Sequence, residues 1–209
     1  MGQKEELKKY KKAGEIAKKA KQYARKIIEK DKLLVDIANQ IENKILDSEG
    51  KLAFPTTLAI DDVAAHSTPT HNDKEKASGL LKIDLGVHVD GHIADTAFSI
   101  DLEDDEKNKK LIKASREALN RAIKKAKKGI KLSDIGKEIQ EKIQSYSFSP
   151  IKNLQGHKLD NYDLHAGLNI PNYNNNSYQK LPLGFYAIEP FSTKGEGKVY
   201  EGKPSGIYQ

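Results

Sequence analysis

Apolar residues recur at three- and four-residue steps in four stretches of the chain, and this spacing predicts four amphipathic helices. We expect them at residues 8–30, 33–46, 107–128 and 132–145. Two of the stretches are related in sequence. The segment LVDIANQIENKI, Leu34–Ile45, matches LSDIGKEIQEKI, 98 residues later, at six of twelve positions. Such a repeat indicates an internal duplication into two halves, each built from helices and a sheet.

Within the repeat, Asp36 and Asp134 hold the same position near the predicted start of a helix. A carboxylate in that place can accept hydrogen bonds from the free backbone N–H groups of the first turn. We therefore expect both side chains to cap their helices.

Between the helices the pattern changes to one typical of strands. Leu80–Val89 and His92–Leu102 are rich in β-branched and apolar residues, and the Asp90-Gly91 pair between them is a strong hairpin signal. Further strands are expected at 164–170 and 182–193. Helices combined with antiparallel hairpins indicate an α+β domain.

Composition narrows the chemistry. The 209 residues include no cysteine, so disulfides, thiolate ligands and cysteine nucleophiles are excluded, and any metal must be held by His, Asp and Glu. Hydrophobic residues make up 37% and charged residues 32% of the chain, and no apolar run approaches the roughly 18 residues of a membrane span. These features are typical of a soluble globular protein, for which a cytoplasmic location is the default.

The net charge of +6 is concentrated at one end, because residues 1–32 hold twelve Lys/Arg and five Asp/Glu. A solvated helix face explains this excess. The alternative is an electrostatic contact with RNA, for example at the ribosome. We favour the solvated face because no aromatic residues interleave the lysines in a nucleic-acid-binding pattern.

Two carboxylates interrupt the predicted hairpin. With Asp90-Gly91 as the turn, Asp84 faces Ala97 across the strands, and Asp95 is its diagonal neighbour on the same face. Two like charges this close are costly in an apolar setting unless a cation neutralises them. A solvent-facing edge hairpin is the alternative, and the hairpin alone does not decide between the two.

Other polar residues favour the metal. His157 and His165 are flanked by glycine or apolar residues, Glu189 lies in the apolar segment YAIEPF, and His66 follows the strand-like segment 58–65. Two Asp, a His and a Glu form a hard, oxygen-rich set of donors that suits Mn, Fe, Co or Zn.

Four segments then point to a family: AFPTTLAIDDVAAHSTP, KIDLGVHVDGHIADTA, NLQGHKLDNYDLHAGLNIPN and FYAIEPF. Together they resemble, in order, the signature of type 2 methionine aminopeptidases in their short form. The resemblance implies one pita-bread catalytic domain, an α+β fold with pseudo-twofold symmetry. Its halves would cover about 10–103 and 107–195, and residues 196–209 would begin an inserted helical subdomain.

The resemblance also implies the roles of individual residues. Two divalent ions (Co, Mn, Fe or Zn) would be held, with one carboxylate chelating and another bridging, and two histidines and a phenylalanine would contact the substrate. The implied metal ligands are Asp84 (chelating), Asp95 (bridging), His157 and Glu189. The implied substrate contacts are His66, His165 and Phe54, and the two histidines would be catalytic because they would also stabilise the tetrahedral intermediate. Such an enzyme removes the initiator methionine from nascent polypeptides.

The chain departs from the family pattern at its end. Family members continue past the position of Gln209 to a strand that carries a fifth ligand, a second bridging glutamate. Glu196 and Glu201 follow Glu189 too closely to replace it. A truncated gene, a split enzyme with a separate C-terminal subunit, and a degenerate protein all fit this departure. Each implies weak or absent activity of these 209 residues alone.

Two rival functions fit the same fold. One is a non-enzymatic pita-bread protein that binds RNA or the ribosome, and the other is a proline-directed aminopeptidase. Retention of four metal ligands and two histidines favours an enzyme over a binding protein. The hairpin motif and HAGLNIPN favour the type 2 methionine enzymes over proline-directed ones.

Overall fold

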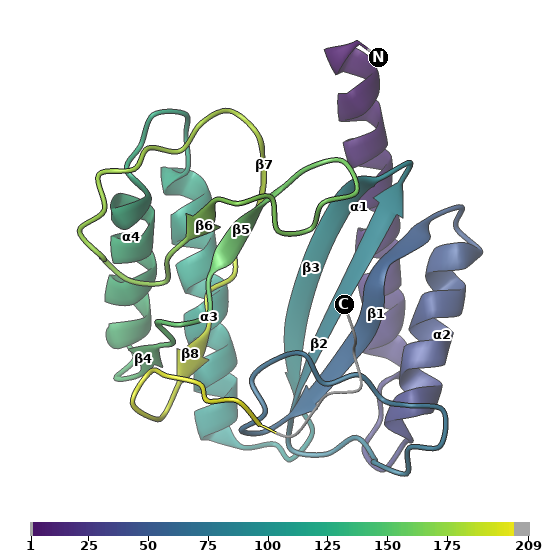
Figure 1. The fold of residues 1–209 in the computed structure, drawn as a ribbon. Coiled ribbons are helices and arrows are strands. Elements are labelled where there is room, and N and C mark those ends of the chain that lie inside the picture. The colour runs from purple at the N-terminus through teal and green to yellow at the C-terminus, as the bar shows by residue number, and fades with distance from the viewer. Residues whose placement is uncertain (1, 203–209) are drawn as a thin grey trace. The chain divides into compact units, whose positions relative to one another are not determined.

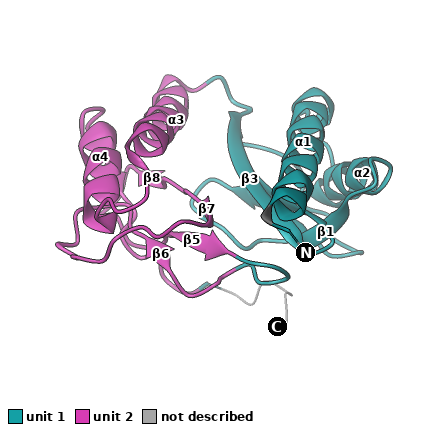
Figure 2. Ribbon diagram, turned by 90° about the horizontal axis from the view of Figure 1, so that it is seen from above, with its two compact units in different colours: residues 1–104, 160–164, 202–209 teal, residues 105–159, 165–201 magenta. Residues whose placement is uncertain are grey.

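The fold is known from a computed structural model that describes residues 2–202. Its residue contacts fall into two compact units (Figure 2). Unit 1 comprises residues 1–104, 160–164 and 202–209, and unit 2 comprises 105–159 and 165–201. The assignment of these units to the two halves of one catalytic domain stays a prediction. The described helices include none long and apolar enough to cross a membrane.

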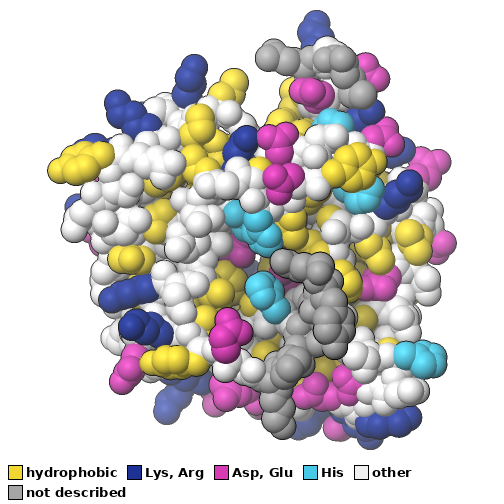
Figure 3. All heavy atoms as spheres, in the orientation of Figure 1, with side chains coloured by type: hydrophobic (Ala, Val, Ile, Leu, Met, Phe, Trp, Pro, Cys, Tyr) yellow, Lys and Arg dark blue, Asp and Glu magenta, His cyan; other side chains and the backbone are white. Residues whose placement is uncertain are grey.

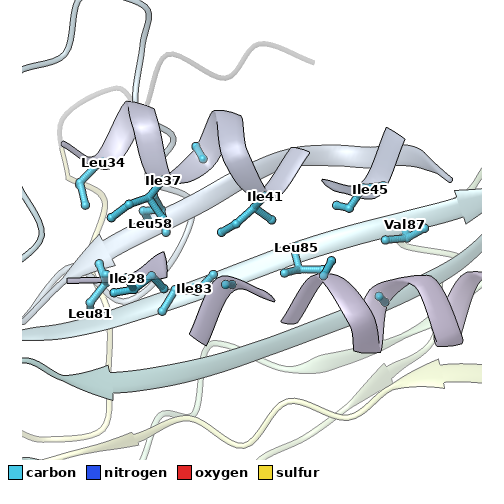
Figure 4. Packing of buried hydrophobic residues seen from close by; sticks show 14 of the residues in the cluster. Ile28, Leu34, Ile37, Ile41, Ile45, Leu58, Leu81, Ile83, Leu85 and Val87 are labelled. Carbon is cyan, nitrogen blue, oxygen red and sulfur yellow. The ribbon is translucent and has the colours of Figure 1, made fainter. Parts of the chain in front are cut away.

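Unit 1 packs two helices on one face of an antiparallel sheet whose strand order is β1-β2-β3 (Figure 1). Its elements are α1 (Gln3–Ile27), α2 (Leu34–Leu46), β1 (Lys51–Ile60), β2 (Leu80–Val89) and β3 (His92–Asp101). The core lies between helices and sheet, where Ile41 of α2 and Leu85 of β2 are fully buried (Figure 4). Each such side chain contributes about 1.5–3 kcal/mol of hydrophobic stabilisation.

Unit 2 pairs two helices with shorter strands. Its elements are α3 (Glu106–Lys125), α4 (Leu132–Gln144), β4 (Ser149–Pro150), β5 (Gly156–Leu159), β6 (Asn169–Ile170), β7 (Phe185–Ala187) and β8 (Ser192–Thr193). The strands form a sheet of order β6-β5-β7 and a separate β4-β8 pair. Ile135, Ile139 and Ile143 of α4 are fully buried in this unit's core.

The repeated segments form equivalent helices. The buried positions of α2 each have a buried counterpart 98 residues later in α4, and these positions of α2 are Leu34, Ile37, Ala38, Ile41 and Ile45. The expected caps are wrong, however. Asp36 and Asp134 lie inside the first turns, and neither N-cap residue, Leu33 or Lys131, makes a side-chain cap.

Backbone groups from distant loops replace the expected caps. The first N–H of α2, on Leu34, donates to the carbonyl of Glu75 at 2.9 Å, and that of α4, on Leu132, donates to Gln179 at 2.9 Å. Each helix start is thus bonded to an extended segment of its own unit, so a carboxylate cap is not needed there.

Two strand predictions also need correction. The expected strand 182–193 is broken into β7 and β8, and Glu189 lies between them. The expected strand 164–170 shrinks to Asn169–Ile170. Pairing of β7 with β5 ends at Ala187, and Pro190, which cannot donate a ladder hydrogen bond, lies in the unpaired stretch before β8.

The lysines of α1 are partly engaged within unit 1. Lys9 pairs with Asp90 at 2.9 Å, Lys12 with Glu49 at 2.8 Å, and Lys21 donates to the Thr96 hydroxyl at 2.6 Å. These contacts are consistent with the helix-face interpretation of the N-terminal charge.

Candidate metal centre

The carboxylate pair sits on the β2–β3 hairpin in the predicted register. Asp84 is paired with Ala97 and Asp95 with Gly86, so the two carboxylates are diagonal neighbours on one face of the sheet. The neighbouring β2 residues Ile83 and Leu85 point to the other face and are buried in the core. The hairpin therefore presents both carboxylates away from the helices, and both side chains are half-buried.

Phe54 lies beside this pair. It is the β1 partner of Gly86, at a register irregularity between Leu52 and Thr57. A Cβ at Gly86 would come within 2.3 Å of the Phe54 ring, so the ring occupies the space above the glycine. Because Gly86 has no side chain, the Phe54 ring can lie next to the face of the sheet that carries Asp84 and Asp95.

The loop Asp160–Leu164, which belongs to the same unit, is hydrogen-bonded to the tip of the hairpin, and we call this contact the clasp. Asp90 and Gly91 have φ values of +48° and +81°, as a type I′ turn requires. Asn161 Nδ2 donates to the Asp90 carbonyl at 2.8 Å, and the Tyr162 N–H donates to the Gly91 carbonyl at 2.9 Å. The clasped loop runs directly into His165.

Two histidines, His88 and His92, lie beside the hairpin turn. His88 Nδ1 accepts a hydrogen bond from the Gly91 N–H at 3.1 Å, and its ring meets that of Tyr162 edge-on at 5.4 Å. Burial, with Lys51 as a second cause, lowers the pKa of His88. His92 is 5% exposed, and its ring meets that of Tyr10 at 4.9 Å. Nothing in the sequence pointed to Asn161 or Tyr162, because they are distant along the chain from the turn they hold.

In unit 2, His157 and Glu189 form a second pair of candidate ligands. His157 Nε2 lies 2.8 Å from Glu189 Oε1, and the His157 residue is 5% exposed. His157 is on β5 opposite Ala187 of β7, two residues before Glu189. A Cβ at Gly156 would come within 2.3 Å of the Ala187 carbonyl oxygen, so the glycine preceding His157 permits this close strand approach.

The two remaining candidate histidines, His165 and His66, differ in their contacts. The His165 ring lies edge-on to His157, with 4.4 Å between centroids, so unit 2 brings both histidines and Glu189 together. His66 is exposed in the loop after β1 and has a φ of +60°, which is uncommon for a residue other than glycine. Within residues 2–202, no hydrogen bond, ion pair or ring contact joins His66 to the other candidate residues of unit 1.

The donor set fits a hard divalent cation. Unit 1 offers two carboxylates on one sheet face, and unit 2 offers an imidazole and a carboxylate whose ligand atoms are 2.8 Å apart. Carboxylate and imidazole ligands suit Mn, Fe, Co and Zn. A His and a Glu held that close, with the histidine buried, are arranged as neighbouring ligands of one ion would be.

Known proteins resemble the chain along almost all of its length. The model of metallopeptidase family M24 matches residues 8–208. A methionine aminopeptidase of Thermococcus onnurineus is 46% identical over 203 residues, which are 94% of this chain and 68% of that protein. One of Methanocaldococcus jannaschii is 42% identical over 200 residues, which are 94% of this chain and 67% of that protein.

Solved structures also resemble the chain along most of its length. The crystal structure of a methionine aminopeptidase from Thermotoga maritima superimposes with a TM-score of 0.87 at 30% identity, covering 95% of this chain and 84% of that chain. A prolidase from Pyrococcus furiosus superimposes with a TM-score of 0.76 at 26% identity, covering 91% of this chain and 57% of that chain.

Proposed function

Because the chain belongs to metallopeptidase family M24, we propose that it is a metalloaminopeptidase that removes methionine from the N-terminus of polypeptides. The fold is the predicted pita-bread fold, shared with the methionine aminopeptidases it resembles. The observation that carries the proposal is the 2.8 Å approach of buried His157 to Glu189, because it places two of the predicted ligands together.

The proposed metal ligands are Asp84, Asp95, His157 and Glu189, holding two divalent ions. The diagonal placement of the two aspartates supports the assignment, since two adjacent carboxylates are stabilised when cations neutralise them. In the proposal Asp95 would be shared between the two ions, and Asp84 would help to hold one of them. When bound, such ions polarise a carbonyl oxygen and lower the pKa of water to near neutrality.

The other candidate residues act on the substrate. His165 lies against His157, where its imidazole can donate a hydrogen bond to oxygen charge that develops on the scissile carbonyl. His66 is proposed to share this role. Phe54, whose ring covers Gly86 beside the carboxylates, supplies an apolar wall for the methionine side chain.

The proposal also defines the partners. Polypeptides with a free N-terminal methionine are the substrates, and they are met in the cytoplasm. A ribosome contact and a separate C-terminal subunit stay predictions. The rival function, a non-enzymatic binding protein of this fold, is less favoured because the chain is 46% and 42% identical to proteins named methionine aminopeptidase.

Metal binding and catalysis can be tested together. We would titrate the metal-free protein with Mn(II) calorimetrically and measure methionine release from Met-Ala-Ser. Asp95→Asn and Glu189→Gln should each weaken Mn(II) binding at least 10-fold, the scale seen when support for a metal ligand is lost. Asp62→Asn and Glu196→Gln change the same groups at exposed positions and should have no effect. Unchanged Mn(II) affinity in both ligand variants would refute the proposed centre.

A further inference from the structure

A surface of unit 2 is built from two segments that are distant in sequence. The connection between α3 and α4 runs beside the loop between β6 and β7, and Lys131 and Lys180 are direct antiparallel partners. The Leu181 N–H donates to the Ile130 carbonyl at 2.8 Å, and the Gly129 N–H donates to the Leu181 carbonyl at 2.8 Å. Leu181 itself is 6% exposed and anchors the loop in the core. The backbone of this surface is therefore fixed.

The two segments carry charge of one sign. Residues 122–133 and 171–184 contain no Asp or Glu, and their lysines are Lys124, Lys125, Lys127, Lys128, Lys131 and Lys180. Lys125 is paired with Glu138 at 3.4 Å. No ion pair within the described residues involves Lys127, Lys128, Lys131 or Lys180. Asp134, in the first turn of α4, is the next acidic residue along the chain. Unneutralised lysines on a fixed backbone favour an anionic partner.

An exposed aromatic ring lies among these lysines. Tyr178 is 82% exposed, and Lys131 Nζ lies 4.8 Å from the centre of its ring. Beside it, Asn174, Asn175, Asn176 and Gln179 are exposed. Dark-blue and yellow side chains both occur at the upper left of Figure 3, where Figure 1 shows the loops above α4. A ring face open to solvent between cations can stack on a nucleobase whose phosphates the cations bind.

The basic helix α1 lacks this combination. Its tyrosines, Tyr10 and Tyr23, are half-buried, and the ring of Tyr10 packs against His92. Glu5, Glu6 and Glu15 also interrupt its lysines. Of the two basic surfaces, only the one in unit 2 joins lysines without ion pairs to an exposed aromatic ring within the described residues.

We propose that the surface formed by Lys127, Lys128, Lys131, Lys180 and Tyr178, the lysine–tyrosine surface, binds single-stranded RNA. The lysines contact phosphates, Tyr178 stacks on a base, and the exposed amides beside it hydrogen-bond to base edges and ribose hydroxyls. A single strand is required because bases in a duplex are stacked on one another and offer no free face to Tyr178. None of its residues is a candidate metal ligand, and the proposal goes beyond the aminopeptidase function.

The lysines are tested by salt dependence. Binding of fluorescein-labelled U12 RNA would be followed by anisotropy at several salt concentrations. Changing Lys127, Lys128, Lys131 and Lys180 together to Gln should lower the slope of log affinity against log salt by about 2–3, since each phosphate contact on a single strand contributes about 0.7. The matched control changes Lys11, Lys18, Lys19 and Lys26 of α1 to Gln and should retain most of the wild-type slope. An equal or larger loss in the control would overturn the proposal.

The ring is tested separately. Tyr178→Ala should weaken U12 binding on the order of 10-fold, whereas Tyr178→Phe should bind like the wild type because stacking needs no hydroxyl. The side chain is 82% exposed, so neither change should alter the thermal unfolding midpoint. Anionic phosphatidylglycerol vesicles serve as the second probe. An unchanged affinity of Tyr178→Ala for U12, or vesicle binding with no RNA binding, would show that the surface does not recognise single strands.

Discussion

The side-chain amide of Asn161 donates to the backbone carbonyl of Asp90 across 2.8 Å, although 71 residues separate the two in sequence. The bond ties the segment that leads into His165 to the turn that joins the strands of Asp84 and Asp95. A loop that is hydrogen-bonded to the tip of the hairpin has few conformations to sample. The clasp thus fixes the turn between the two strands that carry Asp84 and Asp95.

Because of the clasp, two glycine substitutions should lower the free energy of unfolding by different amounts. Gly91→Ala should destabilise the protein more than Gly129→Ala. Both glycines have φ above +80°, so both variants bear a backbone strain of about 1–2 kcal/mol. Only at Gly91 would the new Cβ also meet Tyr162, at 2.3 Å, and Asn161, at 2.5 Å. Urea unfolding of both variants measures the difference, and equal losses would show that the clasp adds no steric constraint.

The clasp should also weaken in acid. Burial lowers the pKa of His88, so below the ordinary histidine pKa the unfolded chain binds a proton that the folded chain resists. The free energy of unfolding should therefore fall as pH drops through about 6.5. His88→Asn keeps a side-chain acceptor for the Gly91 N–H but does not titrate. With EDTA present, the wild type should lose more stability between neutral and acidic pH than this variant; parallel pH profiles would contradict the prediction.

Metal should stabilise the folded chain through the candidate ligands. A ligand at 100 times its Kd adds about 2.7 kcal/mol, or roughly 5–10 °C in Tm for a protein of this size. Differential scanning fluorimetry with Mn(II) and then EDTA should show this shift in the wild type and in Glu196→Gln, and a much smaller one in Glu189→Gln. A full shift in Glu189→Gln would remove that residue from the ligand set.

The contact between Phe54 and Gly86 predicts a compensating pair. Gly86→Ala should cost about 1–3 kcal/mol because its Cβ would overlap the Phe54 ring. Combining it with Phe54→Leu should recover part of that loss, since a smaller side chain leaves room for the methyl group. A double-mutant cycle by urea unfolding measures the coupling. Strictly additive losses would mean that the ring moves aside freely.

Local signals in the sequence predicted the hairpin in detail. The Asp90-Gly91 turn determined its register, and the pairing of Asp84 with Ala97 is confirmed. The apolar spacing of Leu34–Ile45 and Leu132–Ile143 likewise predicted both buried faces. Glu189 was misplaced in a strand because apolar neighbours indicate burial but do not reveal that the pairing of β7 ends at Ala187. The clasp by Asn161 and Tyr162 was missed because it is a contact between distant segments with no periodic signature.

The backbone bonds at the starts of α2 and α4 bear on how the chain folds. Neither helix has a side-chain cap of its own, and the first N–H of each is satisfied only by a carbonyl from a loop much further along the chain. As isolated peptides these short helices should fray at their first turn. In the intact chain, the first turn of α4 can become stable only after the segment around Gln179 has docked. The start of α4 should thus be among the last helical turns of unit 2 to gain protection from amide hydrogen exchange during refolding.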